Sequence, residues 1–244
     1  MHGYANPARF LRLARWLTPL LMLTGLAITG GALAWGVFLG PADYLQGDTV
    51  RILYLHVPAA WLGMWGWVAI AVASLAELVW RHPLAAIAAR AAAVPGAFFT
   101  ALCLYSGSVW GRPAWGTWWV WDGRLTSMLV LLFLYFAYIA LAEAARGSGG
   151  EGQQRMAAIF GLVGAVNIPI IHYSVIWWNS LHQPPSISLG KSAMAPDFLV
   201  PLLVATTGFS LIFGGVILAR MRAILADAQA EARLRRRALE GDDS

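Results

Sequence analysis

Six hydrophobic runs constrain the fold of this chain more than any other feature of its sequence. Each run is long enough to cross a bilayer as a helix, which takes about 20 residues. The runs lie near residues 17–39, 56–79, 91–110, 125–145, 157–178 and 197–219. Only 12% of the 244 residues are charged, and a soluble domain has about 25%. We therefore predict an all-α, polytopic integral membrane protein with six transmembrane helices.

The first hydrophobic run follows Arg9, Arg12 and Arg15, an arrangement that resembles the start of a signal peptide. The run is too long for a signal peptide and lacks a clear cleavage site with small residues, so we expect a retained first span. Residues 1–220 are predicted to form a single six-helix membrane domain. The charged residues 221–244 are expected to form a basic cytoplasmic tail, as a short solvated helix at the membrane surface.

The basic residues predict which ends of the helices face the cytoplasm. When the connecting segments are numbered alternately, thirteen of the 17 basic residues fall on one side. These are Arg9, Arg12, Arg15, Arg81, Arg90, Arg146, Arg155, Arg220, Arg222, Arg233, Arg235, Arg236 and Arg237. The other side holds Arg51, Arg112, Arg124 and Lys191. The positive-inside rule then predicts two cytoplasmic termini and outer segments near 40–55, 111–124 and 179–196.

Several kinds of chemistry are excluded by what the sequence lacks. Cys103 is the single cysteine, so the chain has no internal disulfide, no cysteine-based metal site and no C-x-x-C-H haem attachment segment. It also has no Walker motif, no H-E-x-x-H and no Gly-rich phosphate loop. We expect a protein that is not an enzyme, and any ATP hydrolysis that serves it would occur in a partner subunit.

A tryptophan-rich stretch lies in the middle outer segment and ends at Asp122. Its five tryptophans are Trp110, Trp115, Trp118, Trp119 and Trp121. Because indole presents a large flat apolar face, such a stretch predicts a surface for a large, flat, apolar ligand. The alternative is an aromatic belt at the membrane interface. Asp122 could likewise serve only as the N-cap of the fourth helix.

Two histidines flank this stretch in the neighbouring outer segments. His56 lies at the predicted outer end of the second span, where Pro58 is expected in the first helical turn, and His182 follows the fifth span. Two neutral imidazoles can hold the two axial positions of a haem iron. Arginine pairs with carboxylates such as haem propionates, and Arg51, Arg112 and Arg124 are available on this side. The alternative is that each histidine is a polar tip at a helix end.

The remaining histidines have weaker claims to a function. His2 and His82 are expected to be solvated. His172 lies inside the fifth span, ten residues before His182, which is about 15 Å along a helix. It is expected to form a hydrogen bond with a neighbouring helix near a kink at Pro169. The alternative for His172 is a haem entry site, because ionisable residues within spans are often functional.

Three segments resemble one known family. Residues 115–127, WGTWWVWDGRLTS, resemble the signature of the haem-handling proteins that are named after their Trp-Trp-Asp (WWD) segment. Residues 52–61, ILYLHVPAAW, and 174–184, SVIWWNSLHQP, are similar to the two histidine motifs of one branch. That branch is the haem exporter protein C family, also called cytochrome c maturation protein C. The resemblance covers roughly residues 10–220.

The resemblance implies a function in the biogenesis of c-type cytochromes. A member of this family binds haem b at the periplasmic face of the bacterial inner membrane and presents it to a periplasmic haem chaperone, protein E. It works with an ATP-binding cassette pair, proteins A and B, and a small membrane protein D. The axial ligands would be His56 and His182, and residues 115–122 would bind the haem and help engage the chaperone. Ile176 departs from the family pattern, in which an acidic residue is frequent.

Two other classes of protein remain possible on the sequence alone. A membrane b-type cytochrome would hold haem between histidines deep in facing helices and carry electrons. A channel or permease would use the tryptophans only as an interfacial belt and would bind no haem. A haem absorption band that depends on His56 and His182 would separate the first interpretation from the permease.

Overall fold

The computed structural model describes residues 6–148, 150–183, 186–188 and 191–242. The helices in chain order are α1 (Pro7–Ala34), a π-helical turn (Trp35–Leu39), a 3-10 helix (Asp48–Ile52), α2 (Leu53–Trp80), α3 (Ala85–Trp115), α4 (Gly123–Ser148), α5 (Glu151–Gly164), α6 (Asn167–Trp177) and α7 (Pro196–Asp242). The strands β1 (Ile187–Ser188) and β2 (Lys191–Ser192) pair antiparallel.

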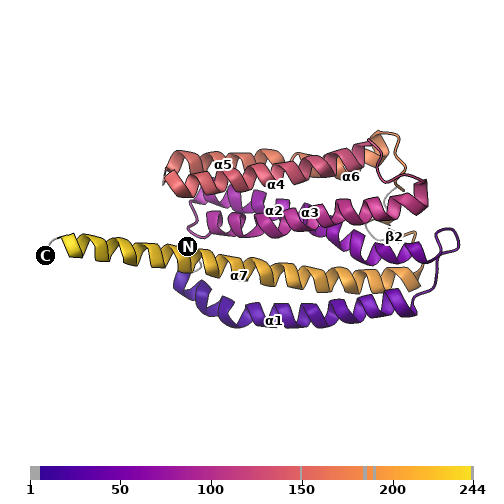
Figure 1. Cartoon of the computed structure of the whole chain (residues 1–244), viewed down its shortest axis with the longest axis horizontal. Helices are drawn as coiled ribbons and strands as arrows, with labels where there is room; N and C mark the ends of the chain where they lie inside the picture. The colour runs from indigo at the N-terminus through magenta and orange to yellow at the C-terminus, as the bar shows by residue number, and fades with distance from the viewer. Residues whose placement is uncertain (1–5, 149, 184–185, 189–190, 243–244) are drawn as a thin grey trace.

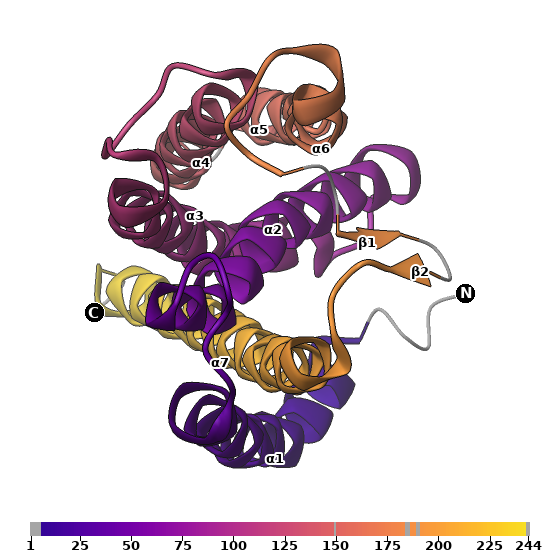
Figure 2. The same cartoon turned by 90° about the vertical axis from the view of Figure 1, so that its right-hand side faces the viewer.

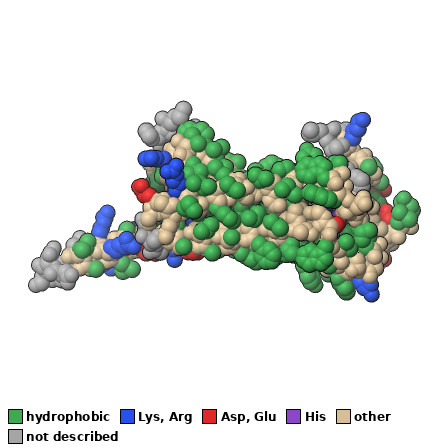
Figure 3. All heavy atoms as spheres, turned by 90° about the horizontal axis from the view of Figure 1, so that it is seen from above, with side chains coloured by type: hydrophobic (Ala, Val, Ile, Leu, Met, Phe, Trp, Pro, Cys, Tyr) green, Lys and Arg blue, Asp and Glu red, His purple; other side chains and the backbone are tan. Residues whose placement is uncertain are grey.

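Six helical segments of the described chain are long and apolar enough to cross a membrane. They are Pro7–Leu39, Asp48–Trp80, Ala85–Trp115, Gly123–Arg146, Glu151–Trp177 and Pro196–Leu239. Hydrophobic side chains cover the middle of the molecule, and charged side chains gather toward its two ends (Figure 3). These observations confirm the prediction of an all-α, multi-pass membrane protein.

The helices form successive layers. α1 packs on α7, α7 packs on the α2–α3 pair, and α4 with α5 and α6 covers the opposite side of that pair (Figures 1 and 2). The main core lies among α2, α3, α4 and α5, and Trp67 is at its centre with an exposure of 0%. The Trp67 indole donates a hydrogen bond to the carbonyl of Gly161, 3.1 Å away. A polar N–H within the apolar core is thereby paired, as burial requires.

Small residues let α1 approach α7 closely. A Cβ atom on Gly25 of α1 would lie 2.8 Å from the backbone nitrogen of Ile212 and 2.9 Å from the carbonyl oxygen of Gly208. Packing of this kind, backbone against backbone, is a common way for transmembrane helices to associate. It holds α1 at the edge of the molecule, outside the main core.

The connections fall into two groups at opposite ends of the bundle. The α2–α3 connection, the end of α4 and the start of α5 lie at the end where α1 begins and α7 terminates (Figure 1). The opposite end carries residues 40–52, 116–122, 178–183, 186–188 and 191–195, and we call it the loop end. This grouping agrees with the alternation used to count basic residues. Which end faces the cytoplasm stays a prediction from the charges.

The fifth span is two helices rather than one kinked helix. α5 ends at Gly164 and α6 begins at Asn167. Proline has no N–H to donate to the carbonyl four residues before it, so Pro169 leaves that of Ala165 free, and the N–H of Ile168 donates to it instead. The Asn167 side chain donates to the carbonyl of Ser127 at 2.9 Å and ties the break to α4.

Two helix boundaries at the loop end differ from the sequence prediction. α2 begins at Leu53, so Pro58 is its sixth residue and not part of its first turn. α3 continues through Pro113 to Trp115, because a proline removes only one backbone donor. The helix ends at Gly116, whose φ is +77°. A positive φ at a glycine is a common helix C-terminus. The middle outer connection is therefore only residues 116–122.

The basic tail is helical and exposed but is not a separate helix. α7 runs unbroken from Pro196 to Asp242, which corresponds to about 70 Å at 1.5 Å per residue. Its last part extends beyond the rest of the bundle (Figure 1). No glycine or proline lies between Arg220 and Leu239, so nothing in the sequence of the tail stops the helix.

Candidate functional site

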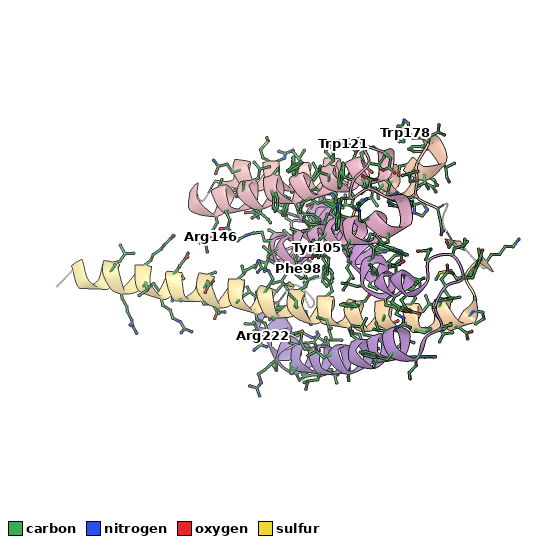
Figure 4. The ribbon with its side chains drawn as sticks, turned by 45° about the vertical axis from the view of Figure 1, so that its right-hand side comes forward. Phe98, Tyr105, Trp121, Arg146, Trp178 and Arg222 are labelled. Carbon is green, nitrogen blue, oxygen red and sulfur yellow. The ribbon has the colours of Figure 1, made fainter. Side chains whose placement is uncertain are left out.

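The loop end brings the two flanking histidines and the tryptophan-rich stretch together. His56 is the fourth residue of α2, and His182 follows α6. The two imidazoles are close enough to interact electrostatically. Trp121 and Trp178 lie at the same end of the molecule, far from Arg146 and Arg222 (Figure 4).

The His56 imidazole is fixed against α3 by its Nδ1 atom. Nδ1 lies 3.1 Å from the carbonyl oxygen of Cys103 and 3.1 Å from the Ser106 hydroxyl. The Ser106 hydroxyl donates its proton to the carbonyl of Leu102. Nδ1 of His56 therefore carries a proton and donates a hydrogen bond to the carbonyl oxygen of Cys103. Since one ring nitrogen of a neutral imidazole is a donor and the other an acceptor, Nε2 keeps a free lone pair.

A glycine makes this position of His56 possible. A Cβ atom on Gly107 would lie 2.8 Å from Cε1 of His56, closer than side chains approach in folded proteins. The Trp110 ring meets the imidazole edge-on, with 5.7 Å between centroids, and its own N–H donates to the side chain of Gln46 at 2.7 Å. The contacts with Gly107, Trp110 and the Cys103 carbonyl together fix the position of the His56 ring.

The His182 imidazole is fixed by a carboxylate. Its Nδ1 lies 3.2 Å from Oδ2 of Asp122, which also accepts a hydrogen bond from the Ser180 hydroxyl. The other carboxylate oxygen, Oδ1, accepts from the N–H of Leu125 at 2.7 Å and caps α4. The Trp115 ring meets the imidazole edge-on, at 4.7 Å between centroids. Asp122 is therefore both the predicted helix cap and a partner of His182.

The charges of this pair follow from its surroundings. Burial opposes ionisation of Asp122, but the hydrogen bonds from Ser180, the Leu125 N–H and His182 outweigh it and hold the pKa of Asp122 below its ordinary value. Burial lowers the pKa of His182, and the hydrogen bond to Asp122 offsets this only in part. At neutral pH the pair is an anionic carboxylate and a neutral imidazole. Nδ1 of His182 is the donor, and Nε2 again keeps its lone pair.

Of the three candidate arginines, Arg124 is the one that interacts with both histidines. It interacts electrostatically with both imidazoles, and its Nη2 donates to the carbonyl of His172 at 3.2 Å. Its Nε atom is buried and has no partner among the described residues. Arg51 likewise has a buried Nε without a partner among the described residues, but its Nη2 pairs with Asp48 at 2.9 Å.

Arg112 also makes a local contact, because its guanidinium donates to the carbonyl of Gly116 at the end of its own helix. It lies on the exposed surface of the loop end. The structure thus places Arg51, Arg112 and Arg124 at the same end of the molecule, and of these Arg124 interacts electrostatically with both imidazoles.

The five tryptophans do not form one continuous flat surface. Trp110 and Trp115 pack on His56 and His182, as described above. Trp118 and Trp121 are exposed, at 57% and 73%. Trp119 is half-buried between these groups, meets Trp121 edge-on and has a buried N–H without a partner among the described residues. The stretch therefore supplies both walls of the histidine site and an exposed aromatic rim.

Several residues of this site were not predicted. Ser106, Gly107 and Ser180 lie beside the two imidazoles, and nothing in the sequence marks Ser106 or Gly107. Ser180 alone carries a local signal, since a hydroxyl two residues before His182 can accept its backbone N–H, as it does at 3.1 Å. A second aromatic pair, Tyr173 stacked on Trp177 at 5.6 Å, extends the exposed rim along α6.

His172 does not join the site through its side chain. The imidazole is exposed and meets the ring of Tyr173 edge-on at 4.9 Å. The expected hydrogen bond to a neighbouring helix exists, but it is made by the backbone carbonyl of His172, which accepts from Arg124. Ile176 on the same helix is also exposed, at 63%.

The fold and the site define a class of protein, namely a multi-pass helical membrane protein that holds two histidine imidazoles at one end, each through a hydrogen bond from its Nδ1. A family model described as "Heme exporter protein C" matches residues 1–236. Two relatives with that name are similar over most of their length. The one from Bradyrhizobium diazoefficiens is 50% identical over 222 residues, 89% of this chain and 82% of the relative.

The relative from Escherichia coli K12 is 44% identical over 225 residues, 92% of this chain and 90% of its own. A plant protein from Marchantia polymorpha, named as a putative cytochrome c biosynthesis ccmC-like mitochondrial protein, is 38% identical over 198 residues, 81% of this chain and 83% of its own. This chain belongs to the haem exporter protein C family.

Proposed function

We propose that this protein binds haem b as cargo at its loop end, between His56 and His182, and presents it to a soluble chaperone during the biogenesis of c-type cytochromes. The observation that carries the proposal is the state of the two imidazoles. Each donates its Nδ1 proton to a fixed acceptor, and neither Nε2 has a hydrogen-bond partner among the described residues. An imidazole that is oriented in this way is ready to bind iron.

Other groups at the loop end suit the rest of a haem molecule. A porphyrin is flat and apolar, and the half-buried rings of Trp110 and Trp115 flank the imidazoles. A haem propionate is a carboxylate, and Arg124 has a buried Nε without a partner beside the histidines. Arginine is the side chain that best matches a carboxylate. Bound haem would supply the iron, and these residues would bind and orient it.

The distribution of basic residues supports an outward-facing site. Thirteen of the 17 Lys and Arg residues lie away from the loop end, and the positive-inside rule places that richer side in the cytoplasm. The loop end then faces the periplasm from the bacterial inner membrane. In that orientation a periplasmic chaperone, protein E, could reach the exposed rim that includes Trp118 and Trp121.

In this proposal the protein acts as a subunit of an export complex. The sequence has no nucleotide-binding motif, so ATP hydrolysis is assigned to an ATP-binding cassette pair, proteins A and B, with protein D as a further small membrane partner. These partners are inferred from the family. The chain itself binds and transfers haem, and it has no enzymatic step of its own in this proposal.

An absorption spectrum of the detergent-purified protein tests the histidine assignment. We expect a Soret band in the wild type and its loss in His56→Ala and His182→Ala. His172→Ala is the matched control, because that imidazole is exposed and outside the site, and it should keep the band. If both of the first variants bound haem as the wild type does, the assignment of the ligands would be wrong.

A further inference from the structure

The two imidazoles at the loop end are held by acceptors of different strength. Nδ1 of His56 donates to a neutral backbone carbonyl, that of Cys103, at 3.1 Å. Nδ1 of His182 donates to a carboxylate, that of Asp122, at 3.2 Å. Hydrogen bonds to a charged acceptor are roughly twice as strong as those between neutral groups. The two candidate iron ligands are therefore not equivalent.

The carboxylate is held both by the start of α4 and by the loop that carries His182. The side chain of Asp122 is only 3% exposed. Its Oδ1 caps the first turn of α4 through Leu125, and its Oδ2 accepts from Ser180 and His182. The Ser180 oxygen in turn accepts the backbone N–H of His182. Asp122 thus connects the end of a membrane helix to the ring of His182.

A carboxylate on the distal nitrogen changes how an imidazole binds a metal. It fixes the tautomer and the ring orientation, and it raises the basicity of the nitrogen that faces the metal. A backbone carbonyl fixes the tautomer but donates less electron density. An iron between these two imidazoles would be bound more strongly by His182 than by His56.

We propose that Asp122 is a positioning residue that acts on the haem through His182, which makes His182 the anchoring ligand and His56 the ligand that is exchanged when the cargo leaves. The inference rests on the proposed function, in which both histidines bind the iron. It assigns Asp122 a role distinct from direct contact with haem. It also gives the transfer step an order, with His56 released first.

Substitution of Asp122 by asparagine isolates this role. Asparagine is as good a helix N-cap as aspartate, so α4 keeps its first turn. When the amide oxygen caps Leu125, the amide NH₂ faces His182 and favours the tautomer with the proton on Nε2, since two donors cannot pair. That tautomer has no lone pair for iron. The variant should keep the fold and lose the ligand.

A double-mutant cycle on the full-length protein tests the proposal. Haem is titrated into the detergent-solubilised wild type, Asp122→Asn, His182→Ala and the double variant. We expect Asp122→Asn alone to weaken haem binding by about 10- to 100-fold. In the His182→Ala background the same change should have little further effect, because the two residues act as one unit. An equal loss in both backgrounds would overturn the proposal.

The cycle separates this inference from the proposed function. If His182→Ala bound haem as tightly as the wild type, the proposed function would fail and the inference with it. If His182→Ala weakened binding but the two effects were additive, the proposed function would stand and only the role of Asp122 would be overturned. Thermal unfolding of haem-free Asp122→Asn, expected close to that of the wild type, checks that the loss is not one of folding.

Two further measurements test the inequality of the ligands. His182→Ala should weaken haem binding more than His56→Ala, and the reverse order would overturn the proposal. The haem midpoint potential should rise in Asp122→Asn relative to the wild type, because the ferric state loses electron donation. His172→Ala is the matched control, since that imidazole is exposed and outside the site, and its potential should not change.

Discussion

At the scale of single residues, the site depends on space as much as on hydrogen bonds. A Cβ atom on Gly107 would lie only 2.8 Å from Cε1 of His56. We therefore expect Gly107→Ala to displace the imidazole and to remove most of the haem absorbance of the purified protein. Gly31→Ala, at a position where a Cβ atom would meet nothing within 4 Å, is the control and should bind haem normally. Full Soret absorbance in Gly107→Ala would contradict the assigned position of His56.

The individual residues also mark the limit of sequence reasoning about this site. His56 and His182 could be selected because each is a lone imidazole at a helix end next to aromatic residues. The pairing of Asp122 with His182 spans 60 residues, and that of His56 with the Cys103 carbonyl spans 47. Contacts over such separations depend on the packing of α2, α3 and α4, which local patterns do not specify. The cap on α4 was predictable because it needs only neighbouring residues.

At the scale of elements, the α1–α7 pair offers a direct test of close helix packing. A Cβ atom on Gly25 would meet the backbone of Ile212 and Gly208 at 2.8 to 2.9 Å, and backbone atoms cannot move aside easily. We expect Gly25→Ala to destabilise the protein by about 1–3 kcal/mol, as overpacking does. Gly30→Ala on the same helix meets nothing within 4 Å, and an alanine there should be neutral or stabilising.

Reversible unfolding in mixed detergent or denaturant would compare Gly25→Ala with Gly30→Ala. Because α1 packs on α7 at the edge of the molecule and the histidines lie elsewhere, both variants should keep haem binding at the loop end. Equal stability of the two variants would show that α1 and α7 are not in close contact.

The helices themselves were more predictable than their ends. All six spans follow from runs of apolar residues, since length and hydrophobicity suffice to define a transmembrane helix. The continuation of α3 through Pro113 and the break between α5 and α6 were not predicted. In both cases proline removes one backbone donor, and whether the helix continues depends on what else satisfies the free carbonyl. At the break between α5 and α6, the N–H of Ile168 donates to the free carbonyl of Ala165, and the Asn167 side chain binds α4.

At the scale of the whole molecule, the bundle separates its chemistry from its charge. The imidazoles, Asp122 and the aromatic rim lie at the loop end, whereas Arg146, Arg222 and the extension of α7 lie toward the other end (Figure 4). The main core, in the middle of the bundle, is packed with large apolar side chains such as Trp67 and Leu131. This arrangement fits the proposal that haem is presented at one surface of the membrane.

The orientation of the molecule can be measured with single cysteines. The native Cys103 is buried, with 6% exposure, and should react little with a thiol reagent. Tyr44 at the loop end is 91% exposed, and a Cβ atom on Gly152 at the opposite end would meet nothing within 4 Å. Tyr44→Cys and Gly152→Cys therefore place one accessible thiol at each end of the bundle.

A reagent that does not cross the inner membrane should label Tyr44→Cys in intact cells and Gly152→Cys only after the membrane is opened. The reason is that the end with Gly152 carries most of the Lys and Arg residues, and translocating those charges is disfavoured. The unsubstituted protein gives the background from Cys103. Labelling of Gly152→Cys in intact cells, with Tyr44→Cys protected, would place the imidazole pair in the cytoplasm and would exclude presentation of haem to a periplasmic chaperone.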